Sequence, residues 1–238
     1  MLRLRGQNDH RTTAGSCAPP GAILKFLKGE IVYAQGDPAT DWFEVISGTV
    51  RTCLLYSDGH RQLTGFFYSG DVFGVDSGSY SSSAEAVTAV TLRRCGRGFG
   101  EDARTEDASP VRGVFESALS NAQACIFLLG RRTAAERMAT FLLATACRFK
   151  PDRPFQLPMS RADIADHLGL TIHTVSRTLS EFVRRNLISL NGPQSITIIN
   201  RTGLHRLAEG ENEPAAGNAN FPTHGKINNE DYAPAFGS

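Results

Sequence analysis

The sequence lacks the features that mark most membrane proteins, secreted proteins and enzymes. None of its apolar runs approaches the roughly 20 residues that a membrane-spanning helix needs. The N-terminus has arginines but no apolar core region behind them, so we expect no secretory signal and a cytoplasmic protein. No P-loop, nucleophile elbow or HExxH motif occurs. The sequence therefore predicts no enzyme and no catalytic residues.

The cysteine pattern predicts neither a disulfide framework nor a metal site. The five cysteines form no CxxC pair and are odd in number, which favours reduced thiols over a disulfide framework. No His, Cys, Asp or Glu cluster has metal-ligand spacing. We therefore expect neither a metal nor a cofactor.

Charge is nearly balanced overall but unevenly distributed. The net charge is +1. Residues 153–206 carry seven arginines and three acidic residues, whereas residues 207–238 carry five acidic residues and one lysine. A basic module followed by an acidic tail is compatible with a polyanionic partner, but the surplus is modest and requires a motif to support it.

The first half of the chain has the rhythm of an all-β domain. After an N-terminal segment expected to be flexible (1–20), short β-type runs such as "WFEVISG", "TVRTCLLY" and "EAVTAVTLRRC" alternate with glycines, and "SDGH" marks a hairpin. We expect a β-sandwich or a closed β-roll over residues 21–108.

A helical period replaces this rhythm at residues 109–131. The apolar spacing alternates between 4 and 3, which is typical of a helix that packs along a partner helix. The alternative is that the helix lies on its own β-domain, but small residues in the middle of the stripe favour a dimer seam. The residues expected in that seam are Val111, Phe115, Ala118, Ala122, Cys125 and Leu129.

A connecting helix is expected over residues 132–150, and three prolines then mark a boundary. Residues 151–206 read as a compact last module. Residues 207–238 are polar, lack periodicity and are expected to be disordered.

The last module has the layout of a helix-turn-helix. Ser160 and Asp163 form a capping-box pattern for a helix over 161–167, and Gly169 permits the turn after it. Thr171 can cap a second helix, whose core spacing is that of Ile172, Val175, Leu179 and Phe182.

The second helix places polar side chains opposite this core. At about 100° per residue, His173, Arg177, Ser180 and Arg184 fall between about 140° and 200° from Val175, with Ser176 at the edge. A major groove about 12 Å wide admits such a helix, and an arginine can bind guanine O6 and N7 with two hydrogen bonds. Downstream, "LISLNGPQSITII" predicts a hairpin that completes a winged helix, with Arg201 and the backbone of 191–195 as further phosphate contacts.

These motifs resemble a known family. The stretches "GDPATDWFEVISGTV", "SGDVFG", "LGRRTAAERMATFLL" and "LPMSRADIADHLGLTIHTVSRTLSEFVRRNLI" are similar to the cyclic-AMP-receptor and fumarate-nitrate-regulator superfamily of bacterial transcription factors, and more narrowly to its FixK-type branch. The resemblance implies an α+β chain: an N-terminal β-roll like a cyclic-nucleotide-binding domain, a long dimerisation helix and a C-terminal winged helix-turn-helix. It also implies a homodimer on a palindromic double-stranded DNA operator, in contact with RNA polymerase.

The resemblance assigns roles to particular residues. The family's base-reading Glu, Ser and Arg match His173, Ser176 and Arg177, so His173 departs from the pattern. The residues expected at the DNA backbone are Thr171, Ser180, Arg184 and Arg185. An operator with outer TTG and CAA elements is implied, and the bases next to them depend on His173.

The sensor part also departs from its relatives. Val75 and Ser82 stand where cyclic-nucleotide-binding members have a ribose-binding Glu and a phosphate-binding Arg. Cys17 is the only cysteine in the N-terminal stretch where oxygen-sensing members hold an iron-sulfur cluster. We expect an activator of microaerobic, denitrification or nitrogen-fixation genes that needs no effector. The alternative is the same DNA reader gated by haem, nitric oxide or a metabolite in the β-roll, with His60 as the one histidine there.

Overall fold

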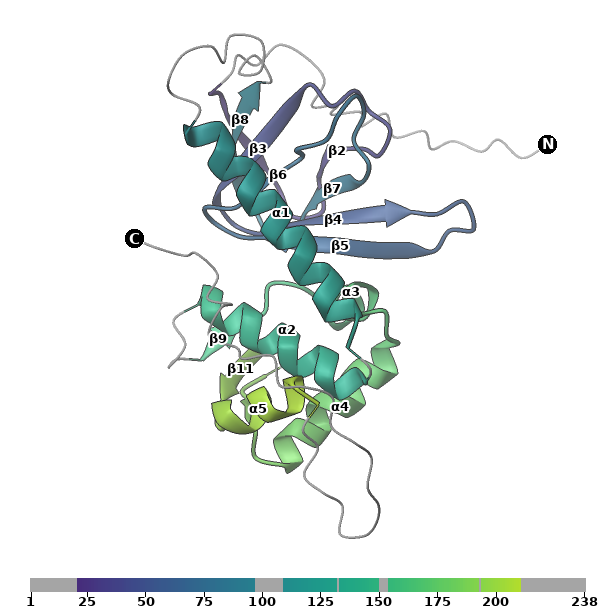
Figure 1. Ribbon diagram of the computed structural model, residues 1–238, viewed down its shortest axis with the longest axis vertical. Helices are drawn as coiled ribbons and strands as arrows, with labels where there is room; N and C mark the ends of the chain where they lie inside the picture. Colours follow the sequence, from purple (N-terminus) through teal and green to yellow (C-terminus); the bar gives the residue numbers. More distant parts are fainter. Residues whose placement is uncertain (1–20, 97–108, 132, 150–153, 193, 211–238) are drawn as a thin grey trace, which may run out of the picture.

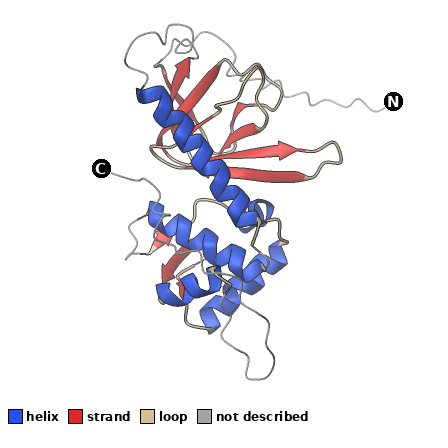
Figure 2. Cartoon of the chain, in the orientation of Figure 1, coloured by secondary structure: helices blue, strands red, loops and turns tan. Residues whose placement is uncertain are grey.

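The computed structural model describes residues 21–96, 109–131, 133–149, 154–192 and 194–210. A β-roll, a long helix α1 beside it and a mainly helical C-terminal domain follow one another along the chain (Figure 1). Strands dominate the first part and helices the second, as Figure 2 shows. The segment 1–20, and all of the expected tail beyond residue 210, lie outside the described residues.

The roll consists of two four-stranded antiparallel sheets, as the turn rhythm predicts. Their strand orders are β1-β8-β3-β6 and β2-β7-β4-β5. The run 85–95, expected as one strand, is divided between two sheets because Val87 and Thr88 donate to the carbonyl of Thr49 instead of continuing a ladder. The strands are β1 (Ile23–Phe26), β2 (Ile31–Tyr33), β3 (Asp41–Ser47), β4 (Val50–Leu55), β5 (Arg61–Phe67), β6 (Val72–Phe73), β7 (Ser83–Ala86) and β8 (Val90–Gly96).

Aromatic rings fill the space inside the roll. The rings of Tyr33 and Tyr80 stack with centroids 3.7 Å apart, and Phe43 stacks on Phe73 at 5.5 Å. All four side chains are at most 4% exposed. Burial of each large apolar side chain contributes about 1.5–3 kcal/mol, so this cluster is a main source of the roll's stability.

The C-terminal domain is a winged helix-turn-helix with one helix and one strand more than the sequence analysis expected. Helix α5 was missed because it is short and contains Gly203, where a Cβ would lie 2.7 Å from Leu187. Its residues Leu207 and Ala208, assigned to the tail, are buried. The elements after the roll are α1 (Ser109–Leu129), α2 (Ala134–Arg148), β9 (Phe155–Gln156), α3 (Arg161–Leu168), α4 (Ile172–Arg184), β10 (Ile188–Leu190), β11 (Ser195–Ile198) and α5 (Arg201–Ala208).

The two domains meet where β5 contacts α3. His167 of α3 is 8% exposed and its ring packs edge-on against Phe66 of β5 and Phe141 of α2. Its Nδ1 lies 3.3 Å from the carbonyl oxygen of Leu63, to which the neutral ring can donate. Burial lowers the pKa of His167 below its ordinary value of 6.5, although the hydrogen bond to Leu63 acts in the opposite direction.

This lowered pKa predicts a loss of stability in mild acid. Between the folded and unfolded pKa values the unfolded chain binds a proton that the folded chain does not, so His167 favours folding fully above about pH 6.5 and less as the pH falls. The slope is at most about 1.4 kcal/mol per pH unit. We expect His167→Gln to flatten the decline of the thermal midpoint between pH 7.5 and 5.5, measured by circular dichroism, whereas His60→Gln at the exposed hairpin tip leaves it unchanged. An unaltered decline in His167→Gln would contradict this expectation.

Candidate nucleic-acid interface

Helix α3 begins at a complete capping box. The Ser160 hydroxyl accepts from the Asp163 backbone N–H at 3.1 Å, and the Asp163 carboxylate accepts from the Ser160 N–H at 3.0 Å. The helix ends at Gly169, whose φ of 61° and ψ of 42° lie in the left-handed region that glycine adopts without strain. The turn therefore has the form that the sequence predicts, and it sets the angle at which α4 departs.

Helix α4 is fixed by one buried face. Val175, Leu179 and Phe182 are at most 2% exposed and belong to the core of the domain. The Thr171 hydroxyl caps the first turn by accepting from the Thr174 N–H at 3.1 Å. Ile172, expected in the core, is instead 50% exposed, because the first turn of α4 extends past the core and Val175, one turn later, is the first residue to enter it.

The opposite face of α4 carries the residues expected to read DNA. His173, Arg177 and Ser180 are exposed, while Ser176 is half-buried at the edge. The Ser180 hydroxyl donates to the carbonyl of Ser176 at 3.0 Å, so it offers only its acceptor lone pairs outward. The four residues share one face of a rigid helix, and that face is polar.

The arginines expected at the phosphates lie further along the same helix. Arg184 and Arg185 are exposed at the end of α4, and among the described residues neither they nor Arg177 forms an ion pair. Arg201 differs, because its guanidinium donates to Cys147 Sγ at 3.2 Å. Arg177 and Arg184 lie on the polar face of α4 and Arg185 caps its C-terminus, so three exposed arginines that form no described ion pair are available for phosphate contacts.

The wing flanks this helix. Strands β10 and β11 pair in antiparallel register, and the Asn191 N–H donates to the Ser195 carbonyl at 3.0 Å to close the turn. Asn191 and Gly192 are exposed at the tip, where Gly192 has a φ of 106°. The sheet gains β9 as a third strand, which sequence reasoning missed because a two-residue strand has no periodicity.

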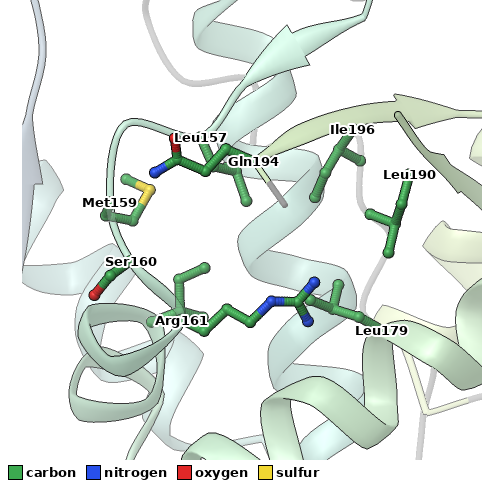
Figure 3. A pocket seen from close by; sticks show the side chains of 9 residues that line it. Leu157, Met159, Ser160, Arg161, Leu179, Leu190, Gln194 and Ile196 are labelled. Atoms are coloured by element: carbon green, nitrogen blue, oxygen red, sulfur yellow. The ribbon is translucent and has the colours of Figure 1, made fainter. Parts of the chain in front are cut away.

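A cavity of about 320 Å³ opens between α3, α4 and the wing (Figure 3). Its lining is largely apolar, with Leu157, Leu179 and Ile196 shared with the domain core. Arg161, its one charged lining residue, extends across the hollow toward Leu179 (Figure 3). The hollow lies behind the reading face and adds no polar group to it.

Helix α1 has one face on its own chain and one face exposed. Leu128 is 6% exposed and joins the core shared with α2, while Ala118 and Cys125, expected in the dimer seam, are half-buried. The side chains of Val111 and Phe115 lie outside what the structure describes. The exposed apolar stripe consists of Leu119, Ala122, Ile126 and Leu129, at spacings of 3, 4 and 3 residues.

Tyr33 lies beside Ser82, one of the two positions that match the cyclic-nucleotide site, and beside Gly74. Ser82 is 7% exposed and hydrogen-bonds to the Tyr33 hydroxyl, and a Cβ on Gly74, next to Val75, would lie 3.2 Å from the Tyr33 ring. Burial raises the pKa of Tyr33, so its hydroxyl stays neutral. An aromatic ring thus packs beside Ser82, and neither Val75 nor Ser82 supplies a charge.

The remaining sensor candidates are peripheral. His60 is exposed at the tip of the β4–β5 hairpin, and its backbone N–H donates to Asp58 Oδ1 at 2.9 Å. Cys17 lies outside the described residues. Within the part of the chain that the structure describes, no three His, Cys, Asp or Glu residues are grouped to hold a metal ion.

Comparisons with known proteins agree with this geometry. Residues 136–207 match the Crp-like helix-turn-helix domain, and residues 23–99 match the cyclic nucleotide-binding domain. The nitrogen fixation regulation protein FixK of Rhizobium meliloti is 38% identical over 189 residues, which cover 79% of this chain and 88% of that protein. The chain belongs to the CRP/FNR family of transcription regulators.

Other members of the family extend the comparison. The chain aligns with the structure of FixK2 from Bradyrhizobium japonicum with a TM-score of 0.72 and 38% sequence identity. The alignment covers 78% of this chain and 96% of the FixK2 chain. The transcriptional activator protein anr of Pseudomonas aeruginosa is 33% identical over 198 residues, or 78% of this chain and 80% of that protein. The family and fold predicted from sequence are confirmed: this chain is a DNA-binding transcription regulator, and its relatives are named as regulators rather than as enzymes. Among the described helices, none is long and apolar enough to span a bilayer.

Substitutions on α4 should separate base reading from backbone binding. If Arg177 binds a guanine as the sequence predicts, Arg177→Ala should lose about 1–3 kcal/mol of discrimination at that base, because two hydrogen bonds to it are removed. Arg184→Ala should instead weaken all sequences alike and reduce the salt slope by about one. Fluorescence anisotropy with operator and scrambled duplexes at several salt concentrations measures both. An Arg177→Ala variant that keeps the wild-type ratio of operator to scrambled affinity would refute the assigned reading face.

Proposed function

We propose that the protein is a homodimeric, sequence-specific transcription activator that binds a TTG/CAA-type palindrome without a small-molecule effector. Its genes would be those of microaerobic respiration, denitrification or nitrogen fixation. The observation that carries this proposal is the polar face of α4, which is held outward by a wholly buried opposite face. FixK and anr are named as regulators, and anr as an activator, which supports recruitment of RNA polymerase by this chain.

The base contacts follow from the order of residues along α4. Arg177 would bind guanine, Ser176 would contact a neighbouring base, and His173, at the N-terminal end, would read the pair next to the outer element. The exposed Ile172 side chain, absent from the residues expected at DNA, would contact a thymine methyl group. Thr171 and Ser180 would contact the backbone beside Arg184 and Arg185.

Independence from an effector is supported by the inside of the roll. Tyr33 stacks on Tyr80, hydrogen-bonds to Ser82 and lies close to Gly74, so aromatic side chains pack the interior of the roll beside Ser82. A pocket that binds a cyclic nucleotide needs a cation for the phosphate, and Ser82 supplies only a hydroxyl.

Binding of DNA by the purified protein alone tests this part of the proposal. We expect specific binding of a palindromic TTG/CAA duplex, in the range of about 10⁻⁸ to 10⁻¹¹ M at physiological salt, with no ligand added. Anisotropy with and without cyclic nucleotides, together with a visible absorption spectrum of anaerobically purified protein, measures it. Specific binding that arises only after a nucleotide or haem is supplied would establish the ligand-gated alternative instead.

Dimerisation through the exposed stripe of α1 is tested by a charge. Ala122→Glu places a carboxylate in the middle of the proposed seam, where it would lose its hydration on association. We expect monomers by light scattering and a loss of about 10²-fold or more in palindrome affinity, because the second half-site contact is no longer intramolecular. Ala144→Glu, on the exposed face of α2, is the matched control and should remain dimeric. A dimeric Ala122→Glu variant would move the seam elsewhere.

A further inference from the structure

A cluster of buried charges joins the β-roll to the DNA-reading domain. Arg51 of β4 donates through Nη1 to Asp163 Oδ1 of α3 and through Nη2 to Glu85 Oε1 of β7 at 2.7 Å. The Arg51 and Asp163 side chains are only 14% and 6% exposed. Charged groups at this depth persist only when they are paired, so the two domains are held at one place.

Arg61 of β5 adds a second set of contacts beside the first. Its Nε and Nη2 donate to Asp166 Oδ2 at 3.0 and 2.7 Å, and Nη2 also lies 3.3 Å from Asp163 Oδ1. Burial acts to lower the pKa of Arg61, but the hydrogen bond and charge of Asp166 outweigh it, so the pKa is raised and the guanidinium stays charged.

The neighbouring residues of β5 continue this line. The Gln62 side-chain amide donates to the backbone carbonyl of Asp166 at 2.7 Å, and the Leu63 carbonyl faces His167. Three successive residues of one strand therefore bind one face of α3, the face formed by positions 163, 166 and 167. We name Arg51, Arg61, Asp163 and Asp166 the interdomain clamp.

We propose that the interdomain clamp positions α4 for DNA, so that Arg51 and Arg61 of the roll act as positioning residues for operator binding. The inference rests on the proposed function and deepens it, because a permanent contact between the domains would hold α4 in its DNA-binding orientation without an effector.

Helix α3 connects the interdomain clamp to α4. Ile164 and Leu168 of α3 share the core with Val175 and Leu179 of α4, and the short turn at Gly169 joins the two helices. Helix α4 cannot move unless α3 moves with it. The clamp holds the side of α3 that faces β5, whereas the polar face of α4 remains open, and in Figure 1 α4 lies beyond α3 as seen from the roll. The two DNA-binding domains of a dimer can bind both half-sites of a palindrome together only if each domain is held at the required angle to the other.

Neutralising Arg61 tests the proposal. We compare wild type and Arg61→Gln on a palindromic duplex and on a duplex with a single half-site, by anisotropy at fixed ionic strength. We expect a loss of tenfold or more on the palindrome and a change within twofold on the half-site, because one reader needs no fixed angle to its partner. Arg61→Lys, which keeps the charge, should recover most of the loss.

A matched control lies within the roll. Arg93 of β8 forms an ion pair with Glu44 of β3 at 2.7 Å, and this pair joins two strands of one sheet. Arg93→Gln breaks it. It should leave both affinities unchanged. If Arg61→Gln does not fold, Asp166→Asn removes the same contact from a partner that is 30% exposed, and it should show the same split.

The outcomes separate the two proposals. Equal losses on both duplexes, no loss, or a gain on the palindrome would overturn the clamp while effector-free binding by the wild type stands. A wild type that fails to bind the palindrome specifically would overturn the proposed function. Small-angle X-ray scattering of the free dimer then still tests the clamp, which predicts a larger maximum dimension for Arg61→Gln and is refuted by identical curves.

Discussion

Asp163 is the group on which the arrangement of this protein depends. One of its carboxylate oxygens closes the capping box of α3 with Ser160, and the other accepts from Arg51 and Arg61 of the roll. A carboxylate on a side chain that is only 6% exposed is tolerated only when its lone pairs are satisfied. The same residue thus defines where the first helix of the DNA reader begins and where that helix rests on the other domain.

The core of the reading domain converts this anchoring into function. Val175, Leu179 and Phe182 are buried beside Ile164 and Leu168, so the orientation of α4 follows that of α3. The polar residues on the opposite face of α4 therefore point in a fixed direction, because the buried face anchors the helix. DNA binding through such a face requires little reorganisation of the domain, which agrees with the proposal that no effector is needed.

Much of this reader was predictable from local sequence signals. The capping pair, the left-handed glycine and the apolar spacing of α4 act within one or two helical turns, and the structure has all three. Ile172 was misplaced because helical periodicity gives an angle around the axis but not the point along it at which the neighbouring helix begins to cover it. Helix α1 shows the same limit: its apolar spacing predicts a stripe, but only the packing of Leu128 in the core with α2 decides which apolar residues stay exposed.

The sequence by itself determined the order of the domains, the type of each long element and the residues that face outward on α4. These properties depend on periodicity, caps and turns, which are local. Only the tertiary structure decided that Tyr33 stacks on Tyr80 and hydrogen-bonds to Ser82 inside the roll, and that β5 binds α3 through Arg61, Gln62 and Leu63. These contacts join residues about 50 to 105 positions apart, and no local pattern encodes which distant side chains pair; burial of charge and close packing select them when the chain folds.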